Sequence, residues 1–263
     1  MNGTQRDLIA ELAMSVPDGQ HYEHAPIQEA ILEIRVSGVE DSVLDALQGV
    51  VAQPGYGQHG PEFDLTAEMG FDGEEFVSNA QRTHIGFRAI RDDGQRVLRA
   101  HKDRFSYSWV KPYDRWDSFI DEALAGWNDY CEVASPDVAT RIGVRFINRI
   151  DIARKCVEIK DYLRTTVDIS PYLPQALSGF FFQVDVPLDR HNASSRIIST
   201  LVQPESPETT SLVLDLDTWR EVSLDLRSDD AKDEMAAHLR DLRALKNYVF
   251  EACITDATRG LIQ

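Results

Sequence analysis

The sequence predicts an α+β protein in which antiparallel sheets carry helices packed on one face. Three observations support this fold class. Several segments alternate apolar and polar residues, two segments repeat apolar residues at helical spacing, and 43% of the 263 residues are hydrophobic. We expect a β-α-β-β-α-β first part over residues 1–154. A three-stranded part and a long C-terminal helix then follow over residues 155–263, and both parts share one core.

The elements of the first part follow from local patterns. Residues 30–36 alternate in hydrophobicity, which predicts a half-buried strand, and residues 41–50 have the capping residues and spacing of a helix. The stretch 53–75 is rich in glycine, proline and acidic residues, so we expect a long loop there. Two predicted strands, 83–90 and 96–110, flank an Asp-Asp-Gly turn that is typical of a hairpin.

The next elements complete the first part and build the second. Apolar residues at helical spacing between Trp116 and Cys131 predict an amphipathic helix, and residues 140–152 predict a strand. Polar turns then separate three predicted strands, and one apolar stripe predicts a long helix. These four elements are expected at 180–188, 195–203, 211–225 and 230–254.

The net charge of −17 is unevenly distributed along the chain. Residues 1–81 hold fifteen acidic and two basic residues, whereas residues 82–154 hold thirteen basic and eleven acidic residues. Nucleic-acid binding is disfavoured, because phosphate contacts need clustered Lys and Arg. The acidic first third instead indicates a protein partner with a basic surface.

Composition and motifs indicate the setting of the protein. Cys131, Cys156 and Cys253 are widely spaced and odd in number, so we expect neither a disulfide framework nor a zinc site. No apolar run approaches the ~20 residues of a membrane span, and the first residues do not resemble a signal peptide. We expect a cytoplasmic protein outside the membrane. No glycine-rich phosphate loop, nucleophile elbow or H-E-x-x-H motif occurs, which argues against an enzyme and indicates no cofactor or metal.

The strand at 140–152 carries the main candidate site. Alternate residues of a strand face the same side, so Arg141, Arg145 and Arg149 share the face opposite the apolar one. Guanidinium groups match carboxylate and phosphate geometry, which makes this face a candidate for binding an anionic small molecule or a nucleotide. The candidate ligand-binding set is completed by polar residues of this strand and a neighbouring one: Asn148, Arg99 and His101.

An internal network of ion pairs is the alternative interpretation of the same arginines. The chain has a large surplus of acidic residues, and structural ion pairs are common. Acidic residues that are candidate partners are Glu29, Glu33, Glu74 and Glu75. Asp215 and Asp217 share a strand face and form a candidate metal pair, but the sequence shows no third ligand.

Three stretches of the chain resemble a known family. They are P-I-Q-E-A-I-L-E-I-R at 26–35, R-I-G-V-R-F-I-N-R-I at 141–150, and the segment 242–256. Together they resemble a sporadically distributed bacterial family of about this length, which has no established activity. The resemblance implies an accessory role, of the defence or toxin–antitoxin type, and implies no particular chemistry.

The sequence therefore favours a non-enzymatic interaction or accessory protein that uses an acidic surface. The alternative hypothesis is a ligand-sensing module or enzyme that acts on an anionic small molecule or nucleotide at the arginine-lined sheet face.

Overall fold

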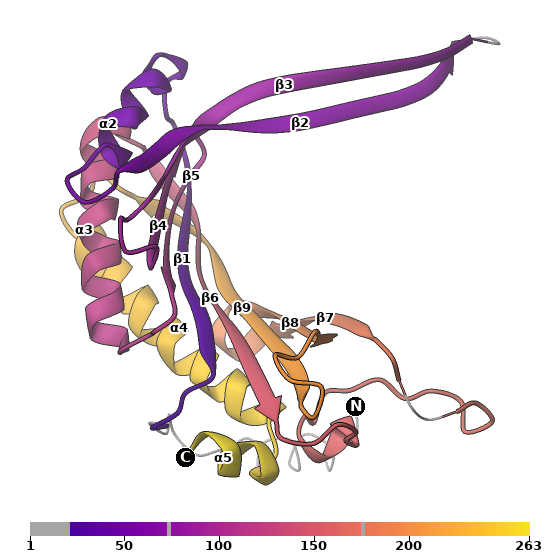
Figure 1. Ribbon diagram of the computed structural model, residues 1–263. Helices are drawn as coiled ribbons and strands as arrows, with labels where there is room; N and C mark the ends of the chain where they lie inside the picture. Colours follow the sequence, from indigo (N-terminus) through magenta and orange to yellow (C-terminus); the bar gives the residue numbers. More distant parts are fainter. Residues whose placement is uncertain (1–21, 73–74, 175–176) are drawn as a thin grey trace. The chain divides into compact units, whose positions relative to one another are not determined.

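The structure, a computed structural model, describes residues 22–72, 75–174 and 177–263 (Figure 1). These ranges contain a nine-stranded antiparallel sheet with the order β2-β3-β4-β5-β1-β6-β9-β8-β7. Its strands are β1 (Ile27–Ser37), β2 (Gln58–Asp72), β3 (Glu75–Ile90), β4 (Arg96–His101), β5 (Arg104–Val110), β6 (Val138–Ile152), β7 (Phe181–Leu188), β8 (Ala193–Val202) and β9 (Thr210–Asp225). The α-helices are α2 (Gln48–Val51), α3 (Trp116–Ala134), α4 (Ala231–Cys253) and α5 (Asp256–Ile262), and 3₁₀ helices lie at Asp41–Val43, Asp45–Leu47, Ile159–Asp161 and Asp189–His191.

The chain forms two compact units that are interleaved in sequence. Unit 1 comprises Met1–Ala30, Ile142–Glu221 and Lys232–Gln263, and unit 2 comprises Ile31–Arg141 and Val222–Ala231. Strands β1, β6 and β9 therefore each contribute residues to both units. Within the described ranges, no helix is long and apolar enough to cross a membrane.

In unit 2, helix α3 packs against the aromatic side chains of β5. Its buried residues recur at the three- and four-residue spacing of one helix face. Phe105 contacts Trp127 and Tyr130, with ring centroids 5.9 and 5.7 Å apart, and Tyr107 contacts Phe119 at 6.0 Å. Phe105, Tyr107, Phe119 and Tyr130 are among the largest fully buried side chains, and aromatic side chains contribute much of the apolar area that a core buries.

Glu122 on α3 ties the helix to the sheet of unit 2. Its carboxylate accepts hydrogen bonds from Tyr107 Oη at 2.5 Å and from Arg96 Nε at 2.9 Å. The guanidinium carbon of Arg96 lies 3.2 Å from the ring centroid of Trp109. Burial opposes ionisation of Glu122, but the hydrogen bonds from Arg96 and Tyr107 outweigh it and lower its pKa. The ionised carboxylate of Glu122 therefore links α3 to the sheet, and Arg96 is held by Glu122 and by the ring of Trp109.

In unit 1, strands β6, β9 and β8 build a second core together with α4 and α5. Alternate strand residues point into it, as period-two patterning predicts. Its buried apolar members include Ile150, Ile152, Ile197, Leu212, Leu214, Leu216, Val249, Ile254 and Ile262.

The predicted fold class is wrong in its organisation. Strands β7, β8 and β9 continue the sheet from β6, so the described residues contain no separate three-stranded part. The helix predicted at 230–254 is present as α4, but the seven-residue α5 follows it, so the expected arrangement ending in a long C-terminal helix is wrong. Local periodicity reports the elements but not which strands pair across long sequence separations, and here that pairing joins the strands into one sheet.

The first part also contains more strands than β-α-β-β-α-β. Residues 58–72, which we predicted as part of a loop, form β2, and the single strand predicted at 96–110 is the hairpin of β4 and β5. Glycine, proline and acidic residues indicated a loop, but β2 is an edge strand, where these residues are tolerated. Figure 1 shows β2 and β3 as a long hairpin that continues well past β4.

Candidate functional site

Arg145 of β6 is held by an ion pair with Asp215 of β9. Arg145 Nε and Nη2 donate to the two carboxylate oxygens of Asp215 at 2.8 and 2.5 Å. The Asp215 side chain is 8% exposed and the Arg145 side chain 44% exposed. The hydrogen bonds to Asp215 raise the pKa of Arg145. The fork of this arginine is thus already matched to a carboxylate of the chain itself.

Arg149 lies four residues further along β6, on the same face of unit 1. Its Nε donates to Asp151 at 3.0 Å, and its Nη2 donates to Ser211 Oγ at 3.2 Å. Ser211 in turn donates to Asp151. The three side chains form a closed network between β6 and β9.

Asn148 does not join these arginines. It lies on the opposite, buried face of β6 and is 2% exposed. Its amide nitrogen donates to the carbonyl oxygens of Phe146 at 3.1 Å and Leu214 at 3.0 Å. The Asn148 amide thus provides hydrogen bonds to buried backbone carbonyl groups, since polar groups in a protein core are generally hydrogen-bonded.

Arg141 belongs to unit 2 and pairs with Glu33 of β1. The distance from Arg141 Nη1 to Glu33 Oε1 is 2.7 Å, and the arginine side chain is 8% exposed. Glu33 was one of the acidic partners expected from the sequence. Another expected acidic partner, Glu74, lies outside the described residues.

Arg99 and His101 of β4 meet Glu62 of β2 in unit 2. His101 Nε2 lies 2.6 Å from Glu62 Oε2, and Arg99 Nε lies 3.5 Å from Glu62 Oε1. Strands β5 and β1 separate β4 from β6, so this group lies about 14 Å from Arg141 across the sheet. The candidate ligand-binding residues therefore fall into separate groups, each contacting an acidic side chain or a backbone carbonyl of the chain.

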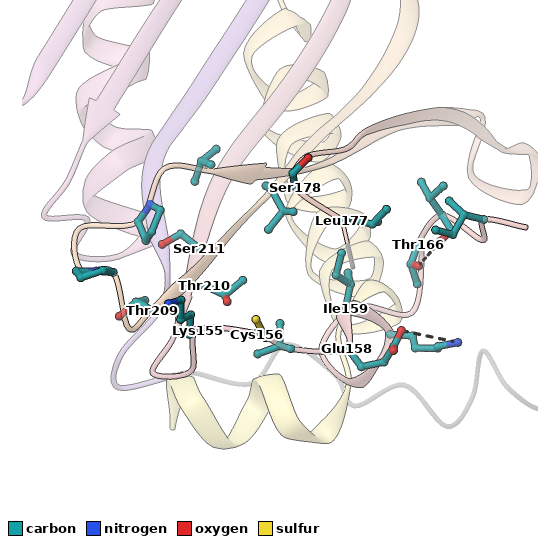
Figure 2. Close-up of a pocket in the computed structure, with 18 of the residues that line it drawn as sticks. Lys155, Cys156, Glu158, Ile159, Thr166, Leu177, Ser178, Thr209, Thr210 and Ser211 are labelled. Atoms are coloured by element: carbon teal, nitrogen blue, oxygen red, sulfur yellow. Dashed lines mark hydrogen bonds and ion pairs between the residues drawn. The ribbon is translucent and has the colours of Figure 1, made fainter. Parts of the chain in front are cut away.

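A pocket of about 360 Å³ lies in unit 1, next to the Arg149 network. Figure 2 shows Thr209, Thr210 and Ser211 on one side of it and Ile159 and Thr166 on the opposite side. Its basic side chains are Lys155 and Lys160, and Lys160 Nζ lies 3.8 Å from Glu158. Glu158 and Asp168 also line the pocket and balance the two lysines, so the pocket offers hydroxyl and ammonium groups to an anion without a net positive charge.

Neither a metal site nor a known relative defines a chemistry for these residues. In the part of the chain that the structure describes, no three His, Cys, Asp or Glu side chains are grouped to hold a metal ion. Asp215, which we considered as half of a metal pair, instead binds Arg145. Comparison with known protein families and with curated protein sequences gave no match for this chain.

The sequence indicated the acidic segment as a partner surface but not its structure, which is the hairpin of β2 and β3. The segment 62–84 contains six acidic residues and one arginine, a net charge of −5 with histidine neutral. Its apolar and polar residue types alternate from Phe63 to Asp72, which is the signal of a strand. That signal was present in the sequence and was outweighed by the loop-forming composition around it.

Proposed function

We propose that this chain is a non-enzymatic interaction protein, which binds a basic protein partner through an acidic surface. The observation that carries this proposal is the acidic hairpin of β2 and β3, whose segment 62–84 has a net charge of −5 with histidine neutral. Complementary charge raises the rate and specificity of association between proteins. The resemblance described above supports an accessory role in a bacterial defence or toxin–antitoxin-type system, and the three free cysteines are compatible with action in the cytoplasm.

The pairing of the arginines also supports this choice. Arg141, Arg145 and Arg149 each contact a carboxylate within 3.0 Å. An anionic ligand at any of them has to displace that carboxylate, which lowers its net gain in binding free energy. Asp64 of the hairpin, in contrast, is exposed, so a basic partner can reach it directly from solvent.

The proposal is tested by capturing partners on the immobilised full-length chain from a lysate of its host, at about 50 mM salt, with elution at about 500 mM. A variant with four hairpin acids neutralised, Asp64→Asn, Glu68→Gln, Asp72→Asn and Glu75→Gln, is expected to lose the captured protein. A matched control neutralises four exposed acids elsewhere: Glu205, Glu208, Glu221 and Asp229. Equal capture by both variants, or no salt-sensitive partner on the native chain, contradicts the proposal.

The pocket of unit 1 favours a second candidate function, a ligand-sensing module or enzyme for an anionic small molecule or nucleotide. Ser211 lines this pocket and accepts a hydrogen bond from Arg149, which links one candidate arginine to an open hollow. A ligand bound to the native state at 100 times its Kd stabilises by about 2.7 kcal/mol. A thermal-shift screen against phosphate, nucleotides and dicarboxylates that gives no stabilisation contradicts this second function.

A further inference from the structure

In the described ranges of the chain, the outer part of the β2–β3 hairpin is a ribbon of two strands. The register of β2 and β3 runs from Gln58 opposite Ile90 to Asp72 opposite Glu75. The pairing of β3 with β4 covers only Gly86 to Ile90. Among the residues that the structure describes, no third strand pairs with the hairpin beyond Gly86. An isolated two-stranded hairpin is marginally stable in water, so such a ribbon gains stability from whatever covers it.

The base of the ribbon is fixed by a bulge at Gly86. The register shifts between Glu62 and Phe63, which lie opposite Gly86 and His84. Gly86 has φ +150°, and a Cβ there would lie 2.2 Å from the carbonyl oxygen of Ala100. Glycine is thus required, and the bulge sets the direction in which the ribbon leaves the sheet.

The two faces of the ribbon differ in chemistry. Residues directly opposite in an antiparallel pair share a face, and Leu65 lies opposite Arg82 while Ala67 lies opposite Ala80. Leu65 is 79% exposed, and the guanidinium of Arg82 lies 3.6 Å from the ring centroid of Phe63. The other face carries exposed polar residues, among them Asp64, Thr66, Gln81 and Thr83. The ribbon is thus amphipathic, and its apolar face is open to solvent at Leu65.

The charge of the ribbon identifies the occupant of this face. A net charge of −5 over residues 62–84 repels the phosphates of nucleic acid and of anionic lipid, and it repels the same ribbon of a second copy. We propose that the face formed by Phe63, Leu65, Ala67 and Ala80 docks against the apolar strip of a protein partner, whose Lys and Arg residues reach past the edge strand β2 to acidic residues of the other face such as Asp64. The inference rests on the proposed function and adds the contact surface and the chemistry of the partner.

Synthetic peptides that mimic the partner's surface test this inference. Three fluorescent peptides of about ten residues alternate Leu with Lys, Ser with Lys, and Leu with Glu, and their binding to the full chain is measured by anisotropy at low salt. The native chain is expected to bind the Leu–Lys peptide about tenfold more tightly than the Ser–Lys peptide, and the Leu–Glu peptide not at all. Leu65→Ser is expected to abolish that tenfold difference.

The matched control is Phe181→Ser. Phe181 is 67% exposed on the edge strand β7, so this variant removes an exposed apolar side chain of similar size outside the ribbon. It is expected to bind the peptides like the native chain. An equal loss in Phe181→Ser and Leu65→Ser overturns the inference, because it shows general adhesion to exposed apolar residues.

The outcomes separate failure of the inference from failure of the proposed function. Equal, salt-sensitive binding of the Leu–Lys and Ser–Lys peptides overturns the apolar docking face but leaves an acidic interaction surface standing. Absence of binding to both lysine peptides overturns the inference and counts against the proposed function itself. Sedimentation of a dimer that Leu65→Ser dissociates overturns the inference in another way, because a second copy is then the occupant.

Discussion

Replacement of Arg145 by alanine separates the two interpretations of the arginine face. The change leaves Asp215, whose side chain is 8% exposed, without the two hydrogen bonds of 2.8 and 2.5 Å that it accepts from Arg145. Removing one partner of a buried ion pair costs about 3–5 kcal/mol. Arg145 is 44% exposed, so water reaches one side of the pair, and we expect the lower end of that range, about 3 kcal/mol.

Substitution of the partner residue, Asp215, should lower the free energy of unfolding less than substitution of Arg145. Asp215→Asn keeps the shape of the buried side chain and leaves behind an arginine that is already half exposed and is easily hydrated. We expect a loss of about 1 kcal/mol in the free energy of unfolding. The order of the two effects follows from the unequal burial of the two partners, and it is a stricter test than either magnitude alone.

Thermal unfolding followed by circular dichroism measures both effects. For a domain of this size each kcal/mol shifts Tm by about 2–4 °C, so we expect a decrease of about 6–12 °C for Arg145→Ala. Arg196→Ala is the control, because Arg196 makes the same two-bond contact with Asp185 (2.7 and 2.7 Å) on the surface of the same unit. A Tm for Arg145→Ala no lower than that of Arg196→Ala would refute the structural interpretation and favour a ligand site.

Three further predictions concern a glycine, a lysine and a tyrosine. Gly86→Ala is expected to lower the free energy of unfolding, measured by chemical denaturation, by about 3 kcal/mol, because its Cβ meets the backbone of Ala100. Gly60→Ala is the control, since a Cβ there has no atom within 4 Å, and it should change this free energy by less than about 1 kcal/mol. Burial lowers the pKa of Lys246 to about 7, so the folded state disfavours the charged form and loses stability as the pH falls from about 10 towards 7. Lys246→Met should therefore raise Tm more at pH 6 than at pH 10. An equal increase in Tm at both pH values contradicts this prediction. Burial raises the pKa of Tyr22 to about 12, so its contribution to stability is complete below pH 10 and is lost as the pH rises towards 12. In denaturation curves, Tyr22→Phe should lose less free energy of unfolding than the native chain between pH 10 and 12. An equal loss in both proteins would show that Tyr22 is not its source.

The sequence predicted the local elements better than their assembly. The apolar spacing between Trp116 and Cys131 indicated a helix, and α3 spans Trp116–Ala134 with its aromatic residues buried. The alternation in β6 placed Arg145 and Arg149 opposite a buried apolar face, as the structure has them. Such patterns are local, because the pitch of a helix or the pleat of a strand repeats within a few residues.

The candidate site was harder to predict, since ion pairing depends on residues far apart in sequence. Asp215 is 70 residues from Arg145, and no spacing rule in the sequence connects the two. Glu62 meets His101 only because β2, which we predicted as loop, pairs with β3 beside β4. Asn148 shows the same limit within one strand, because its position beside Arg149 hid that it faces the core.

The sequence by itself determined the acidity of the first third, the alternation of the strands and the amphipathic face of the main helices. These properties follow from residue type and short-range geometry alone. Only the tertiary structure decided that the strands form one sheet, that the arginines are paired with acids, and that β2 and β3 extend beyond β4 as an acidic ribbon. Strand partners and ion pairs are chosen by the free energy of the whole assembled sheet, to which residues distant in sequence contribute as much as near ones.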